Sequence, residues 1–244
     1  MKYQIPESII ELANNMAKIK GLKTLLKPFY YSYKNFLVNK RNKYFMMNAK
    51  QVLNSFDKSM NEGGYFYTLA FGTLLGAVRE KGFIKHDLDI DVFMWSEDWN
   101  YELQRHLEKS GFNLVHRYLV GEGSLGREET YAKDDISIDI FYIYPAVELY
   151  PYCCDFLSFP DTATARQSMS VHGAVIARRI ELPIKKERIY ASFENLQLYI
   201  PKNFKEILTF RYGPDYMIPN HNWTIHSHDN HIVEWTDNPG ILVI

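Results

Sequence analysis

Two segments of the chain alternate apolar and polar residues, which is the pattern expected of strands with one buried face. In residues 87–95 (DLDIDVFMW) every even-numbered position is apolar, and three of the odd-numbered positions are aspartates. In residues 136–144 (ISIDIFYIY) the even-numbered positions are again apolar or aromatic, and Asp139 faces the other way. Because successive side chains of a strand point to opposite faces, each segment predicts a strand with carboxylates on one face.

The rest of the chain divides into short apolar or aromatic runs and longer mixed runs, separated by glycine, proline and polar clusters. Short β-branched or aromatic runs indicate strands, and longer runs with capping signals indicate helices. Residues 146–170, with scattered Pro, Ser, Thr and Asp, are expected to be irregular. We expect further strands at residues 65–71, 113–120, 127–133 and 193–201. We expect helices at residues 6–20, 28–60, 72–82, 99–112 and 202–212, with Ser96-Glu97-Asp98 as the cap of the fourth.

This mixture of elements predicts an α+β fold, with a mixed β-sheet flanked by helices. Gly63 and Gly64 end the long helical segment, so we expect a helical N-terminal extension over residues 1–63 and a body over residues 64–244. The chain has 244 residues, of which 46% are hydrophobic and 23% charged. That balance is typical of a globular protein with a core large enough to fold without disulfides.

The two cysteines, Cys153 and Cys154, are adjacent, so we expect no disulfide between them and no zinc site. Their small number suits a reducing compartment. The sequence has no run of eighteen apolar residues and no signal-peptide pattern at its start. These features lead us to expect a cytoplasmic protein.

Charge is unevenly distributed along the chain. Residues 1–50 carry ten Lys/Arg and two Asp/Glu, a net charge of +8, whereas the remainder carries a net charge of -9. A basic leader predicts contact with an anionic surface, such as the inner face of a membrane. The alternative is a helical brace that packs on the core and keeps its lysines in solvent. No motif that reads DNA or RNA accompanies the basic residues, so we expect no nucleic-acid partner.

The carboxylates on the acidic face of residues 87–95 are candidate metal ligands. Three carboxylates at alternate positions, Asp87, Asp89 and Asp91, repel one another when they are buried. A divalent cation removes that repulsion, and Mg²⁺ or Mn²⁺ commonly binds one or two carboxylates together with substrate phosphates. The alternative is an exposed edge strand with solvated aspartates. We interpret Asp89 and Asp91 as a metal-binding pair.

Two neighbouring features strengthen the metal interpretation. Gly72-Thr73 stands directly after an expected strand and at the start of a short helix, where backbone N–H groups attract anions. Asp139 is a single carboxylate on the second alternating strand. Alone it would more often pair with Lys or Arg, but beside the first acidic strand it becomes a candidate third carboxylate.

Together these parts resemble the nucleotidyltransferase fold, which combines a Gly-Ser/Thr helix start, an acid-x-acid strand and a third acid on a later strand. The run GTLLGAVREKGFIKHDLDIDVFMW (72–95) also resembles the signature of the LicD family, which includes the fukutin-like proteins. The later pieces IDIF (138–141) and RYGPDYMIP (211–219) are similar to downstream blocks of that family. The likeness covers roughly residues 65–219.

The resemblance implies an enzyme that transfers a phospho-alcohol, such as phosphocholine, ribitol phosphate or glycerol phosphate. The donor would be CDP-activated, and the acceptor would be a sugar hydroxyl of a cell-surface glycan or lipid-linked oligosaccharide. By matching position, Gly72 and Thr73 would hold the donor phosphates, and Asp89 and Asp91 would bind Mg²⁺ or Mn²⁺. Asp139 would either bind a metal or accept the proton of the acceptor hydroxyl.

Four further positions enter through the same resemblance. Arg79 would contact a phosphate or form a salt bridge to the acidic strand. Lys85 and His86 stand where the family commonly has other residues, so they would alter which donor group is recognised. Asp87 lies one step outside the acid-x-acid pair and is a candidate substrate-binding residue.

Two other functions fit the same residues. The protein could be a nucleotidyltransferase that moves an NMP to a small molecule or a protein, or a non-catalytic glycan-binding relative. The C-terminal segment adds a histidine cluster that could bind metal, phosphate or sugar, or could be a polar surface segment. Its members are His221, His226, His228 and His231.

Overall fold

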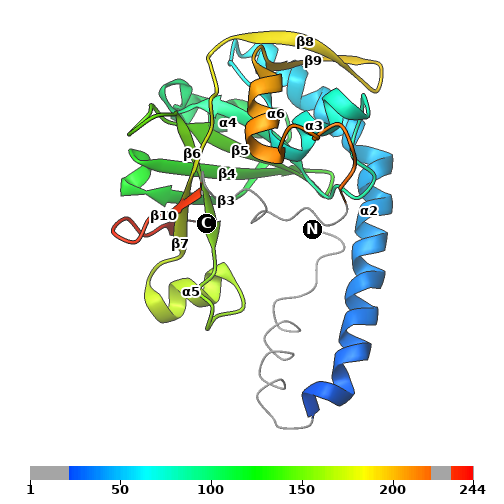
Figure 1. The fold of residues 1–244 in the computed structure, drawn as a ribbon, viewed down its shortest axis with the longest axis vertical. Coiled ribbons are helices and arrows are strands. Elements are labelled where there is room, and N and C mark those ends of the chain that lie inside the picture. The colour runs from blue at the N-terminus through cyan, green and yellow to red at the C-terminus, as the bar shows by residue number, and fades with distance from the viewer. Residues whose placement is uncertain (1–21, 221–231, 244) are drawn as a thin grey trace.

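A mixed β-sheet forms the centre of the structure, and helices from both ends of the chain lie beside it (Figure 1). This computed structural model describes residues 22–220 and 232–243. The expected α+β fold class is confirmed. The helices are α2 (Leu22–Glu62), α3 (Phe71–Arg79), α4 (Tyr101–Lys109), α5 (Ala165–His172) and α6 (Phe204–Tyr212), and short 3-10 turns occur at Ser96–Asp98 and Gly121–Gly123.

The central sheet has six strands in the order β1-β2-β5-β4-β3-β11. Strands β2 and β5 run parallel to each other, and the other neighbouring pairs are antiparallel. A parallel pair in the middle of the sheet brings equivalent ends of two strands to the same edge. Its strands are β1 (Thr68–Leu69), β2 (Ile90–Trp95), β3 (Asn113–Val120), β4 (Gly126–Lys133), β5 (Ile136–Ile143) and β11 (Ile241–Val243).

The remaining strands form two smaller sheets. One has the order β10-β7-β6 and the other is the hairpin β8-β9. Helix α5 connects β6 to β7 and lies at one end of the molecule, whereas the hairpin lies at the opposite end (Figure 1). The bounds are β6 (Tyr152–Leu157), β7 (Ile176–Glu181), β8 (Arg188–Phe193), β9 (Leu196–Pro201) and β10 (Ile232–Glu234).

The C-terminal half of α2 belongs to the main hydrophobic core. Its buried side chains recur every three or four residues, which is the spacing of one helix face. Phe56 meets the rings of Tyr67 and Phe112 edge-on, at centroid distances of 5.4 and 5.7 Å. Burying a large apolar side chain contributes roughly 1.5–3 kcal/mol, so this face anchors the helix firmly. The buried residues are Phe45, Ala49, Val52, Leu53, Phe56 and Met60.

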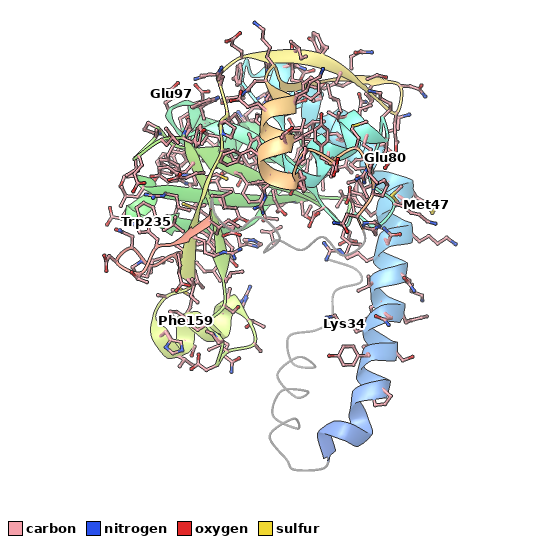
Figure 2. All side chains as sticks on the ribbon, in the orientation of Figure 1. Lys34, Met47, Glu80, Glu97, Phe159 and Trp235 are labelled. Carbon is pink, nitrogen blue, oxygen red and sulfur yellow. The ribbon has the colours of Figure 1, made fainter. Side chains whose placement is uncertain are left out.

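The N-terminal half of α2 extends beyond the body. Residues 31–36 and 38–40 are exposed, and Figure 2 shows Lys34 on this part of the helix. The brace interpretation therefore holds for the C-terminal half of the helix, and membrane contact by the other half stays a prediction. None of the described helices is long and apolar enough to cross a bilayer.

A buried carboxylate fixes the middle of the central sheet. Glu129 on β4 is fully buried, and its Oε1 accepts hydrogen bonds from Arg117 Nε at 2.6 Å and Arg127 Nη1 at 2.8 Å. Its Oε2 accepts from the hydroxyls of Tyr131 and Tyr142, at 2.9 and 3.0 Å. Buried charges are tolerated when they are paired and fully hydrogen-bonded, as Glu129 is. Strands β3, β4 and β5 are thereby held in one register.

Several sequence expectations about the elements are wrong. Residues 146–170 are not irregular throughout, because they contain β6 and most of α5. Strand β6 is defined by its ladder with β7, which lies far along the chain, so local alternation does not reveal it. Helix α4 is capped by Asn100, whose side chain accepts from Leu103 N, while Ser96–Asp98 forms a separate turn. Strands β7, β8, β10 and β11 were not expected at all.

The other expected elements are present with shifted ends. The helices at 28–60, 72–82, 99–112 and 202–212 correspond to α2, α3, α4 and α6, and the strand at 65–71 shrinks to β1. The expected strands at 113–120, 127–133, 136–144 and 193–201 correspond to β3, β4, β5 and β9. Cys153 and Cys154 are free cysteines, and both are buried. The helix expected at residues 6–20 lies outside the described residues.

Candidate active site

Asp91 and Asp139 are direct neighbours in the central sheet. They are paired positions of the parallel strands β2 and β5, so their side chains emerge on the same face. The same row continues across the antiparallel strands to Thr130 on β4 and His116 on β3. The pairing confirms that the two acidic strands lie side by side.

A hydrogen-bonded chain runs along this row. The Thr130 hydroxyl donates to Asp139 Oδ1 at 2.6 Å, and His116 Nε2 lies 2.9 Å from the same hydroxyl oxygen. Because a hydroxyl has one hydrogen and gives it to the carboxylate, we infer that His116 donates to Thr130. The chain fixes the orientation of the Asp139 carboxylate.

The start of α3 holds Asp91 from the other side. Gly72 N donates to Asp91 Oδ2 at 3.2 Å, and Asp91 N donates to Thr73 Oγ1 at 2.9 Å. The chain turns sharply from β1 into α3 at Phe71, whose φ of 36° lies in the left-handed region that few non-glycine residues adopt. Its ring packs against Phe93 and Phe141, with centroids 5.0 and 4.8 Å away, and these contacts hold the turn.

Asp87 and Asp89 do not lie on a strand, because β2 begins at Ile90. The expected strand over 87–95 is therefore too long at its start. Asp87 instead closes a turn: its Oδ2 accepts from Ile84 N at 3.0 Å, and its own N donates to Ile84 O at 2.9 Å. The backbone of this turn is bonded to α2 rather than to a neighbouring strand, which explains why the ladder stops.

Two side chains of α2 hold that turn. Asn42 Nδ2 donates to the carbonyl oxygens of Lys85 and Asp87, at 2.9 and 3.0 Å. Arg41 Nη2 donates to Leu88 O at 3.1 Å. The carbonyls before Asp89 are thus fixed by a helix that lies 43 to 47 residues earlier in the chain.

Burial and mutual repulsion raise the pKa values of the clustered carboxyl groups. Burial is the main cause for Asp91, whose pKa lies well above its ordinary value, and the charges of Asp89, Asp139 and Asp87 add to it. Burial and the charge of Asp89 raise the pKa of Asp139 to about 7, although the Thr130 hydrogen bond opposes the change. Burial also raises the pKa of Asp87 to about 7 and that of Asp89 above its usual range.

Most of the site residues predicted from the sequence lie close together in the structure. Gly72, Thr73, Asp91 and Asp139 meet through the contacts above, and the charges of Asp87 and Asp89 act on them. Thr73 is buried, and its oxygen is occupied by the backbone of Asp91. The roles of these residues in metal and substrate binding stay predictions.

Three other selected positions lie at the margin of the cluster. Arg79 Nε pairs with Glu80 at 2.7 Å, and the positive charge of Arg79 lowers the pKa of Asp87. Lys85 and His86 are exposed in the turn that precedes Asp87. The histidine cluster at residues 221–231 lies outside the described residues.

The structure adds residues that the sequence did not select. Arg41, Thr130 and His116 were missed because long-range packing brings them to the site, and no local pattern marks them. Tyr212, at the end of α6, is also close: after burial, the charge of Asp91 raises the pKa of its phenol. The sequence did contain a signal for it, because Tyr212 lies in the RYGPDYMIP block that resembles the LicD family.

Comparison with known sequences decides the family. The sequence model of the family described as LicD/FKTN/FKRP, nucleotidyltransferase domain, matches residues 64–203. The chain belongs to the LicD family. The matched range contains the acidic cluster, β1 to β9 and α3 to α5, and it leaves α2 outside.

Relatives of this LicD-family protein include transferases. Ribitol-5-phosphate transferase FKTN of Macaca fascicularis is 30% identical over 100 residues, which are 41% of this chain and 22% of the relative. The protein of the same name from Homo sapiens is 29% identical over 100 residues, with the same coverage. An uncharacterized protein of Caenorhabditis elegans is 31% identical over 105 residues, or 27% of its length. The chain thus matches about a fifth to a quarter of the length of these relatives.

The donor set of the cluster fits a hard divalent cation. Its oxygens come from carboxylates, whose pKa values are raised first by burial and then by one another's charges. Within residues 22–220 and 232–243, no three His, Cys, Asp or Glu side chains are already placed around one point as metal ligands. A site for Mg²⁺ or Mn²⁺ would therefore use one or two of these carboxylates and be completed by substrate phosphates, and it stays a prediction.

Asp139→Asn should change how stability depends on pH. An aspartate in the unfolded chain titrates near pH 4, whereas burial raises the pKa of Asp139 to about 7 in the folded protein. The folded state binds this proton more tightly, so the wild-type protein loses stability as the pH rises from about 4 to about 7. In urea unfolding without metal, the free energy of unfolding of the variant should rise relative to that of the wild type by a few kcal/mol over this pH window. At higher pH the difference between the two proteins should stay constant. A difference that does not vary with pH would contradict the burial argument.

Proposed function

We propose that this protein transfers a phospho-alcohol from a CDP-activated donor to a hydroxyl group of a glycan, with Mg²⁺ or Mn²⁺. The observation that carries the proposal is the pairing of Asp91 with Asp139 beside the N-terminus of α3, within a LicD-family domain. Relatives named ribitol-5-phosphate transferase FKTN support the class of reaction. A ribitol-phosphate, glycerol-phosphate or phosphocholine donor is the substrate class to test.

Asp89 and Asp91 are the residues that would hold the cation. Asp91 is oriented by Gly72 N, and Asp89 directly precedes β2, so both carboxylates reach the same end of the strand. When bound, Mg²⁺ or Mn²⁺ supplies charge neutralisation at the donor phosphates. The carboxylates also keep the site attractive to cations before the donor arrives.

Asp139 is the residue that would accept the proton of the acceptor hydroxyl. A raised pKa makes a carboxylate a better proton acceptor, and burial raises the pKa of Asp139 to about 7 in the site without metal. In the proposed step the acceptor oxygen forms a bond to phosphorus, the bond from phosphorus to the CMP oxygen breaks, and the proton passes to Asp139. Thr130 keeps the carboxylate aligned for that transfer.

The start of α3 would receive donor phosphate oxygens. Backbone N–H groups at a helix N-terminus carry partial positive charge and have no partner within the helix. Gly72 has no side chain, and a Cβ placed there would lie 3.6 Å from Asp91 Oδ2 and 3.8 Å from Asp87 Oδ1. The glycine therefore leaves open the space that faces the carboxylates.

A donor panel tests the reaction. CDP-ribitol, CDP-glycerol and CDP-choline should be compared with NTPs in the presence of Mg²⁺, with CMP and pyrophosphate as the products to be measured. We expect CMP release from one CDP-alcohol when a glycan acceptor is present. Pyrophosphate release from an NTP would instead favour a nucleotidyltransferase, and release of neither product would favour a non-catalytic binding protein.

Asp89→Ala tests the metal pair. We expect transfer to fall by about 10²–10³-fold or more, because a charge-stabilising group is lost from the site. Asp237→Ala, in an exposed turn after β10, is the matched control and should leave transfer unchanged. Full activity of Asp89→Ala with Mg²⁺ present would contradict the assignment.

We also propose that the N-terminal half of α2 contacts an anionic membrane. From residue 12 to residue 56 the chain carries nine Lys/Arg and no Asp or Glu. Tyr33 and Phe36 are 43% and 52% exposed on this half, beside Lys34 and Lys40. Basic residues mixed with exposed aromatics are the composition that binds the surface of an anionic bilayer.

Vesicle sedimentation tests the membrane proposal. The protein should sediment with phosphatidylglycerol-containing vesicles at low salt, and not with phosphatidylcholine alone. Lys34→Glu with Lys40→Glu should abolish binding, whereas Lys58→Glu, on the part of α2 beside the body, should weaken it much less. A self-association that these changes disrupt, without vesicle binding, would show that a second copy covers the surface instead.

A further inference from the structure

Arg41 on α2 carries a positive charge close to the acidic cluster. It lies outside the residues that match the family model. Arg41 Nη2 donates to the carbonyl of Leu88, the residue before Asp89, at 3.1 Å. Its charge acts on two carboxylates that come from different elements, because it opposes the rise in the pKa of both Asp89 and Asp139. The guanidinium therefore lies within electrostatic reach of both sides of the site.

Arg41 has unused hydrogen-bonding capacity. A guanidinium has five N–H donors, and the Leu88 carbonyl uses one of them. No carboxylate of the described residues forms a salt bridge with Arg41, although Asp89 and Asp139 are near enough to feel its charge. An arginine that is close to an acidic site but not neutralised by it is suited to an anionic ligand.

The position of Arg41 is fixed before any ligand binds. On the next turn of α2, Phe45 is 1% exposed, and Ala49 and Leu53 continue the same face into the core. Asn42, the neighbouring residue, is bonded to the carbonyls of Lys85 and Asp87. The helix and the turn that carries Asp89 are therefore one rigid unit, which is the condition for a pre-organised binding group.

We propose that Arg41 binds the pyrophosphate of the nucleotide-activated donor. The proposal rests on the proposed function for the existence of a donor, and it adds a binding residue that the LicD domain of residues 64–203 does not contain. Guanidinium groups bind phosphate oxygens through two parallel hydrogen bonds, and they remain charged at all relevant pH values. Arg41 would thus bind the donor and stabilise the charge that grows on the leaving CMP.

The competing explanation is structural, since the hydrogen bond to Leu88 could be the whole role of Arg41. Arg41→Gln separates the two roles, because glutamine keeps an amide donor for the carbonyl and removes the charge. Arg41→Lys keeps the positive charge and loses the two parallel N–H donors of the guanidinium. Asn42→Ala removes bonds to the same turn without removing any charge, and Lys43→Ala removes an exposed charge from the same helix.

Calorimetric titration with inorganic pyrophosphate and Mg²⁺ gives a readout that needs neither the donor nor the acceptor to be known. We expect Arg41→Gln to weaken pyrophosphate binding about 10- to 100-fold. Arg41→Lys and Asn42→Ala should each weaken it by a smaller factor, the second because the turn before Asp89 loses two hydrogen bonds, and Lys43→Ala should lie within about twofold of the wild type. Thermal unfolding of each variant checks that it is folded.

Once a donor is identified, Arg41→Gln should raise the KM for the donor and leave the KM for the acceptor unchanged. Equal binding by the wild type and Arg41→Gln would overturn the role of Arg41 while leaving the proposed function intact. A loss of pyrophosphate binding as large in Asn42→Ala as in Arg41→Gln would also overturn it, since it would show that the turn, and not the charge, matters. A wild type that binds no pyrophosphate with Mg²⁺ and releases no CMP would overturn both proposals.

Discussion

The parallel pairing of β2 with β5 is the constraint on which the rest of the site depends. It places Asp91 beside Asp139 on one face of the sheet, where burial and repulsion both disfavour ionisation. The surrounding groups offset part of that cost: Gly72 N bonds to Asp91, the Thr130 hydroxyl bonds to Asp139, and Arg41 supplies positive charge. On the proposed function, a cation bound by these carboxylates would offset the rest of that cost and stabilise the folded state.

Helix α2 has one of the two roles that the sequence suggested as alternatives, and the residues proposed for the other role are exposed. Its C-terminal half packs in the core and, through Arg41 and Asn42, fixes the turn that leads to Asp89. Its N-terminal half extends beyond the body, with Lys34 and Phe36 exposed. A membrane contact at that end would therefore be connected to the acidic cluster by one continuous helix, which could place the site at a set distance from lipid-linked acceptors.

The sequence predicted what is encoded locally. The alternation around Asp91 and Asp139 identified both strands and their acidic faces, and the family signature then linked them to the helix start at Gly72. Contacts between distant segments could not be predicted in this way. The strand predicted over residues 87–95 is too long at its start, because the turn before β2 is bonded to α2. Arg41 was not predicted as a site residue, because its contact with Leu88 spans 47 residues of the chain.

If Asp91 serves cation and phosphate binding at a cost in stability, Asp91→Asn should remove that cost together with the binding. Asparagine keeps an acceptor for Gly72 N and removes the buried charge. Without metal, the free energy of unfolding should rise, because burial and the neighbouring carboxylates raise the pKa of Asp91 well above its ordinary value and so disfavour its charge. The stabilisation of the wild type by Mg²⁺ should be absent in the variant. A variant that is less stable without metal, yet still stabilised by Mg²⁺, would show that Asp91 has a structural role and is not a cation ligand.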